Sequence, residues 1–87
     1  MSTPPRVSFP CAYPIKVMVR AEEGVRARID AIIERHAGPL DPATVTERPS
    51  AQRHFIGITY VIEARSEDQI AQLFAALKLC PQVLLVL

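Results

Sequence analysis

The sequence predicts an α+β domain with the ferredoxin-like βαββαβ sandwich, in which two helices cover one face of a four-stranded antiparallel sheet. Three observations lead to this fold class. Two segments alternate apolar and polar side chains, as half-buried strands do, and two others repeat apolar residues at helical spacing. The elements follow in the order strand, helix, strand, strand, helix, strand, which is the split βαβ pattern. Right-handed crossovers then place both helices on one face and give the strand order 4-1-3-2.

The first strand and the first helix are predicted from a change of period. From Pro14 onward, apolar and polar side chains alternate, and the inward set would be Tyr13, Ile15, Val17 and Val19. The next segment changes to helical spacing, with one apolar face made by Val25, Ile29, Ile32 and Ile33. We expect this helix near Glu22–His36, ended by Gly38-Pro39.

The second half of the chain repeats this logic. Thr44–Arg48 is a short β-branched segment. Because Pro49 lacks a backbone N–H, this segment is predicted to be an edge strand. His54–Ala64 is the longest strand, and Ser66 with Gln69 forms a capping box at the start of a helix near Ser66–Leu79. Gln82–Leu87 is the last strand, which we expect to lie parallel to the first. The predicted core consists of Ile15, Val17, Val25, Ile29, Ile32, Ile58, Tyr60, Ile62, Ile70, Leu73, Phe74 and Leu77.

Length and composition limit the organisation and the location. Eighty-seven residues suffice for a single domain, here 9–87, and four of the eight prolines precede residue 15, so 1–8 is predicted to be a flexible tail. No apolar run exceeds five residues, against about 20 for a membrane span, and the N-terminus lacks the apolar stretch of a signal peptide. The two cysteines are expected to be reduced thiols. From these observations we expect a cytoplasmic protein.

The sequence predicts no enzyme, no cofactor and no metal. Acyl phosphate hydrolysis on this fold uses an Arg with an Asn; Arg20 is suitably placed, but the chain contains no Asn. Cys11 and Cys80 lack a nearby Cys or His for a metal site, and only three glycines are present, so no phosphate-binding loop exists. Cys11 could be paired with His36 or His54 as a nucleophile and its base, but no sequence spacing between these residues supports such a pair. We interpret the histidines as a helix-end residue and a strand starter.

The face of the sheet without helices offers the best functional clue. Its outward residues would include an apolar set that suggests an interface with a second copy or another protein: Met18, Phe55, Val61, Leu84 and Val86. Lys16, Arg20 and Glu63 would form the charged rim. The last strand is apolar on both faces, so a shift of one residue would turn Leu84 and Val86 inward.

RNA binding is the alternative, because this fold includes RNA readers that stack bases on strand aromatics. Phe55 lies on the open face beside Arg53 and His54, and Lys16 and Arg20 share that face. Aromatic residues make up only 6% of the chain and its net charge is +1, so a nucleic-acid partner is disfavoured.

Several motifs resemble the YbeD-like family of small bacterial proteins. They are Phe9–Met18, Arg35-His36-Ala37, Arg48-Pro49-Ser50 and the final Val86-Leu87. The resemblance implies an ACT-like ferredoxin fold, a cytoplasmic location, no assigned activity, and a likeness to regulatory domains that bind small effectors. Some members are encoded near lipoate-attachment enzymes. This chain has Val19 where the family usually has Gly, and a β-branched residue there argues against an ACT-type effector site in that loop.

Overall fold

The structure is a computed structural model that describes residues 8–50, 52 and 54–87, and its elements follow the predicted order. The predicted flexible tail falls outside the described residues except for Ser8, which is exposed. The strands are β1 (Cys11–Arg20), β2 (Val45–Pro49), β3 (Phe55–Ala64) and β4 (Val83–Val86). The helices are α1 (Val25–Ala37) and α2 (Glu67–Lys78), and a 3₁₀ turn spans Pro42–Thr44.

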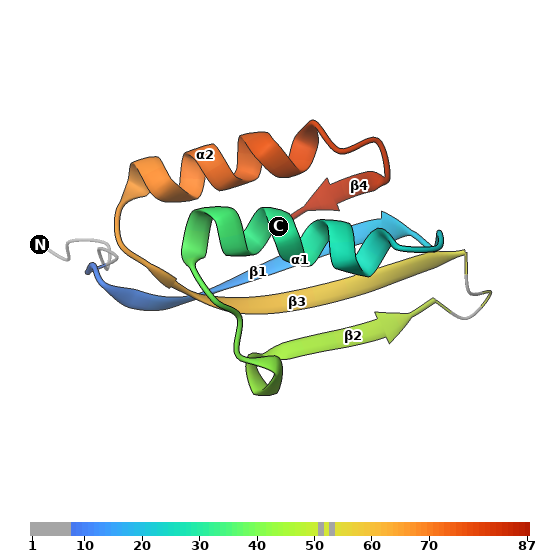
Figure 1. Cartoon of the computed structure of the whole chain (residues 1–87), viewed down its shortest axis with the longest axis horizontal. Coiled ribbons are helices and arrows are strands. Elements are labelled where there is room, and N and C mark those ends of the chain that lie inside the picture. Colours follow the sequence, from blue (N-terminus) through green and yellow to red (C-terminus); the bar gives the residue numbers. More distant parts are fainter. Residues whose placement is uncertain (1–7, 51, 53) are drawn as a thin grey trace, which may run out of the picture.

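The sheet has the predicted topology. Its strands lie in the order β2-β3-β1-β4, which is 4-1-3-2 read from the other edge, and every neighbouring pair is antiparallel. Figure 1 shows α1 and α2 on the same face of this sheet, and the two helices contact each other. The ferredoxin-like fold class is therefore confirmed, and the opposite face of the sheet is left without helices.

The expected parallel pair of first and last strands is wrong, because β1 and β4 run antiparallel. Each βαβ crossover returns the chain in its original direction, so β2 follows the direction of β1, and β4 that of β3. The hairpin between β2 and β3 reverses the chain once. Consequently β4 must run against β1.

Helix α1 begins three residues later than predicted. Gly24 precedes it with a φ of +77°, a left-handed conformation that suits glycine and interrupts any helix from Glu22. Glu22 instead forms a turn, in which its carbonyl accepts from the Val25 N–H at 3.1 Å. The helix ends as predicted at Gly38, a second glycine with a positive φ of +84°.

The start of α2 agrees with the predicted cap. Ser66 Oγ accepts from the Gln69 backbone N–H at 3.1 Å. The Gln69 side chain does not return to Ser66, as a full capping box requires; its Oε1 accepts from the Arg65 N–H, and its Nε2 donates to the His36 carbonyl at 2.9 Å. Gln69 therefore ties the beginning of α2 to the end of α1.

The core lies between the sheet and the two helices. Nine of the twelve predicted core residues are buried, whereas Ile32, Ile70 and Phe74 are only half-buried. Ile33 is fully buried in place of its neighbour Ile32. Four buried hydrophobic residues are additions to the predicted set: Val19, Ile33, Ala64 and Cys80. Burial of Val19 beneath the helices gives this position a packing role.

Candidate functional site

The helix-free face, which we call the open face, is built from outward residues of three strands in register. Lys16 of β1, Thr59 of β3 and Thr46 of β2 form one row across the sheet. Because side chains repeat every second residue, the next row on the same face consists of Met18, Gly57 and Arg48. The pairing of Leu85 with Met18 extends this second row to β4.

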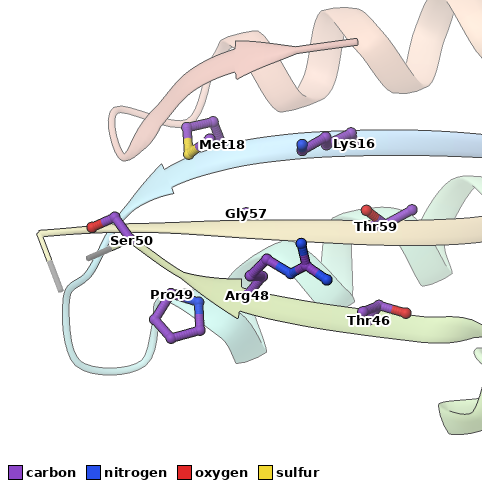
Figure 2. Close-up of a pocket in the computed structure, with 8 residues that line it drawn as sticks. All are labelled: Lys16, Met18, Thr46, Arg48, Pro49, Ser50, Gly57 and Thr59. Atoms are coloured by element: carbon purple, nitrogen blue, oxygen red, sulfur yellow. The ribbon is translucent and has the colours of Figure 1, made fainter. Parts of the chain in front are cut away.

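These rows enclose a hollow of about 410 Å³ on the open face. Figure 2 shows the side chains of β1 and β2 on either side of Gly57, which lies in the middle strand. The lining residues are Lys16, Met18, Thr46, Arg48, Pro49, Ser50, Gly57 and Thr59. We call this site the Gly57 hollow.

Gly57 creates the hollow because it adds no side chain at the centre of the face. Although it lies on the open face, it is buried. A Cβ added here would lie 3.6 Å from Lys16 Cε and 3.8 Å from Met18 Cε, which are ordinary contact distances. The two long side chains of β1 therefore lean over the glycine, and any larger residue would occupy the floor between them.

The lining of the Gly57 hollow carries cations and hydroxyl groups and no carboxylate. Lys16 and Arg48 supply the positive charge, and Thr46, Thr59 and Ser50 supply hydroxyl groups. The Ser50 Oγ accepts from the Phe55 N–H at 3.2 Å, so its own proton remains available for donation. These groups suit a small anion, which accepts hydrogen bonds from Arg, Lys and hydroxyl donors.

The carboxylate nearest in sequence to Arg48 is turned to the other face. Glu47 alternates with Arg48 along β2, so it lies on the helix side, where its Oε1 is 3.6 Å from Arg26 Nη1. Arg26 Nε also donates to Asp30 Oδ1 at 2.8 Å. In the described part of the chain, no ion pair engages Lys16 or Arg48, and the undescribed residues contain no Asp or Glu.

Asp30 also links α1 to the sheet through a buried tyrosine. The Tyr60 hydroxyl donates to Asp30 Oδ1 at 2.5 Å, and the Tyr60 side chain is fully buried. Burial, together with this hydrogen bond to a carboxylate, raises the pKa of Tyr60 far above its usual range. Tyr60 thus stays neutral and fixes α1 against β3, on the side of the sheet opposite the Gly57 hollow.

The predicted apolar interface residues do not form one continuous patch. Met18 lines the Gly57 hollow, whereas Phe55 and Val61 lie six residues apart on β3, about 20 Å along the strand. Both are exposed, by 42% and 39% respectively. Gly57 and Thr59 separate them, so a polar hollow occupies the centre of the face where a single apolar surface was expected.

In the last strand, which is apolar on both faces, the residues that point inward differ from the predicted ones. Val86 pairs with the buried Val17 and packs against the core, so the expectation that Val86 points outward is wrong. The register shifts between Met18 and Val19, which leaves Leu84 as the extra residue of β4. Leu84 is exposed as predicted, and Leu85 joins it opposite Met18.

The predicted rim residues are spread along the open face. Lys16 lies at its centre in the hollow, Arg20 pairs with Phe55 at one end, and Glu63 pairs with Ala12 at the other. They therefore do not surround one surface. The interface itself stays a prediction.

The cysteines and histidines lie on separate elements. Cys11 begins β1, whereas His54 precedes the strand residue that pairs with Arg20 at the other end, about 30 Å away along β1. His36 is half-buried near the end of α1, and Cys80 is buried with its Sγ 3.1 Å from Gln82 Oε1. Cys11 and Cys80 are both free thiols. The strand length thus excludes a Cys11–His54 pair. Arg53 lies outside the described residues.

Sequence reasoning identified Lys16 and Met18 but missed the other residues of the hollow. A usable signal was present: Gly57 interrupts the outward side chains of the longest strand, and a strand glycine often marks a close approach. The partners on β2 could not be chosen, because nothing local to Thr46 and Arg48 specifies which β3 residues lie beside them.

Comparisons with known proteins identify related chains of undefined activity. The model of the family described as "Protein of unknown function (DUF493)" matches residues 4–87. A UPF0250 protein of Ectopseudomonas mendocina is 36% identical, and one of Pseudomonas aeruginosa is 38% identical, each over 97% of this chain and at least 91% of the relative. The solution structure of protein HP0495 from H. pylori superposes with a TM-score of 0.78 at 16% identity, over 99% of this chain and 90% of that one.

Proposed function

Because this chain belongs to the DUF493 family, whose description assigns no activity, we propose its function from its own site: it is a non-catalytic regulatory module that binds a small anionic effector on its open sheet face. The observation that carries this proposal is the Gly57 hollow, where Lys16 of β1 and Arg48 of β2 lie in adjacent rows on either side of the strand that carries Gly57. A phosphate or carboxylate group is the chemistry that two cations and three hydroxyl groups recognise.

The charge distribution supports an anion over a neutral ligand. The net charge of the whole chain is only +1, yet Lys16, Arg20 and Arg48 share the open face with a single carboxylate, Glu63, at its far end. The field over the hollow is therefore more positive than the total charge suggests. The described lining offers hydrogen-bond donors and no carboxylate or histidine beside its hydroxyl groups, which supports the proposed non-catalytic role.

RNA binding through the same face is less well supported. An RNA reader of this kind stacks two or three bases on aromatics of the central strands. Within the described sheet, Phe55 is the single aromatic on the open face, because Tyr13 and Tyr60 are in register with the inward residues Ile62 and Ile15. Phe55 also lies at the end of β3, away from Lys16 and Arg48.

Titration followed by amide NMR tests the proposal. Inorganic phosphate, and separately succinate, should shift the Lys16, Gly57 and Thr59 amides in a saturable manner, relative to chloride at equal ionic strength. Arg48→Gln and Lys16→Gln should each weaken binding severalfold. Arg20→Gln is the matched control, because it removes an open-face cation outside the hollow and should leave the shifts unchanged.

The different ligands in this titration distinguish a phosphate effector, a carboxylate effector and RNA. A response to phosphate alone, or to succinate alone, identifies the effector group. Single-stranded RNA that shifts Phe55 and Arg20 more strongly than the hollow would replace the proposal with nucleic-acid binding. If neither anion gives a saturable shift, or if Arg20→Gln weakens binding as much as Arg48→Gln, the Gly57 hollow is not an anion site.

A further inference from the structure

The two edges of the sheet differ in how they resist pairing with another strand. Natural edge strands are guarded by charged side chains and by proline. At one edge, β2 carries Glu47, Arg48 and Pro49. At the other, β4 has the sequence Val83-Leu84-Leu85-Val86, without a charge or a proline. Among the described residues, β4 has β1 as its one neighbour in the sheet.

The outer side of β4 presents backbone groups suited to a further strand. Leu87 exchanges two hydrogen bonds with Lys16: its N–H donates to the Lys16 carbonyl at 2.8 Å, and its carbonyl accepts from the Lys16 N–H at 3.0 Å. Peptide groups of successive residues in a strand point to opposite sides. The N–H and carbonyl of Val86 therefore point away from β1, toward the open edge.

We propose that β4 pairs with β4 of a second copy of this chain, antiparallel and about a two-fold axis, so that two sheets join into one of eight strands. A two-fold contact places each residue near its own copy, so a charged residue would meet a like charge. Residues 79–87 contain no charged side chain. Leu84 and Leu85 are 44% and 51% exposed and would be covered by the second copy.

The short length of β4 fixes the strength of this contact. Four residues of edge pairing, with two or three leucines a side, bury less than the roughly 1,200 Å² at which stable interfaces begin. The dimer is therefore weak and concentration-dependent. The extra residue at Leu84 interrupts the regular strand, so the most regular pairing should centre on Val86, with Leu84 beside it.

Sedimentation equilibrium of the wild-type chain from about 10 µM to about 1 mM should show monomers that associate into dimers. Leu84→Lys should remain monomeric, because both lysines lie within about 7 Å of the two-fold axis along so short a strand. Val61→Lys is the matched control: Val61 is 39% exposed, on the open face of β3, and should dimerise like the wild type. An equimolar mixture of Leu84→Lys and Leu84→Glu should dimerise again.

Hydrogen exchange supplies an independent readout. The Val86 amide should exchange more slowly at the higher protein concentration, whereas the Leu87 amide, already bonded to Lys16, should not change. A wild-type chain that stays monomeric at about 1 mM, with Val86 exchange independent of concentration, overturns the proposal. So does a dimer that Val61→Lys disrupts and Leu84→Lys leaves intact, which would place the contact on the open face.

Discussion

Replacement of Tyr60 by phenylalanine should remove a defined part of the pH dependence of stability. The Tyr60 hydroxyl donates to Asp30 Oδ1 in a fully buried position, and its pKa in the folded chain lies far above the value of about 10 in the unfolded chain. The unfolded tyrosine therefore loses its proton from about pH 10 upward while the folded one keeps it. A group whose pKa is raised in the folded chain contributes its full stabilisation only below its unfolded pKa. The free energy of unfolding therefore falls as the pH rises above 10.

The size of this effect follows from proton linkage. One proton more in the folded than in the unfolded state lowers the free energy of unfolding by about 1.4 kcal/mol for each pH unit above 10. At neutral pH, Tyr60→Phe should cost about 1.5 kcal/mol, the lower end of the range for hydrogen bonds to a charged group, because Asp30 keeps its bond from Arg26 and is partly exposed.

Urea unfolding of the wild type and of Tyr60→Phe at pH 8 and at about pH 11.5 measures the cost of the lost hydrogen bond and the loss of stability above pH 10. Because the two chains differ only at residue 60, every contribution that they share cancels in the difference. We expect the variant to be about 1.5 kcal/mol less stable at pH 8. At about pH 11.5 the wild type should have lost about 2 kcal/mol, so the variant should lose this whole deficit. A difference in unfolding free energy that is the same at both pH values would refute the reasoning.

Five further substitutions test the packing, the hollow and the helix cap. Ile33→Ala should lower the unfolding free energy by about 2–5 kcal/mol and Ile32→Ala by clearly less; equal losses in urea melts would mean that the buried face of α1 is misassigned. Gly57→Ala should raise stability by about 0.4–1 kcal/mol, since the nearest atom to its Cβ would be 3.6 Å away, an ordinary contact. Gly57→Val should abolish the phosphate-induced amide shifts, and retained shifts would contradict the site. Ser66→Ala should cost about 0.5–2 kcal/mol in thermal or urea unfolding, and an unchanged midpoint would show that its cap bond is not stabilising.

The fold was predictable because period and order are local properties of the chain. The alternation around Ile15 and Val17 and the helical spacing around Ile29 and Leu73 each specify one element, and their order leaves one compact topology. The starts of the helices were harder to predict from the sequence. The acidic pair before Gly24 suits a first helical turn, but the left-handed backbone of Gly24 places the helix start after it. Sequence patterns give the preference of each residue and not the conformation of its neighbour.

The candidate site was only partly predictable, because it depends on register across strands. Lys16 and Met18 are two residues apart and so share a face by periodicity alone, but their approach to Arg48 depends on which residues of β3 lie between them. The last strand illustrates the same limit. Val83–Val86 is apolar at every position, so its inward set was open until the shifted pairing with β1 placed Val83 and Val86 against the core.

The two proposed surfaces meet in one row of the sheet. Met18 lines the Gly57 hollow and pairs with Leu85, so the row from Arg48 through Gly57 continues to the β4 edge. An antiparallel pair of β4 strands has its two-fold axis perpendicular to the sheet, and that axis keeps the open faces of both copies on the same side. Two Gly57 hollows would then share one face, with only uncharged strands between them. A ligand with two anionic groups far enough apart would bind the dimer more tightly than the monomer through effective concentration. Because binding and dimerisation are linked, such a ligand must also strengthen the dimer, whereas a ligand with one anionic group must leave it unchanged.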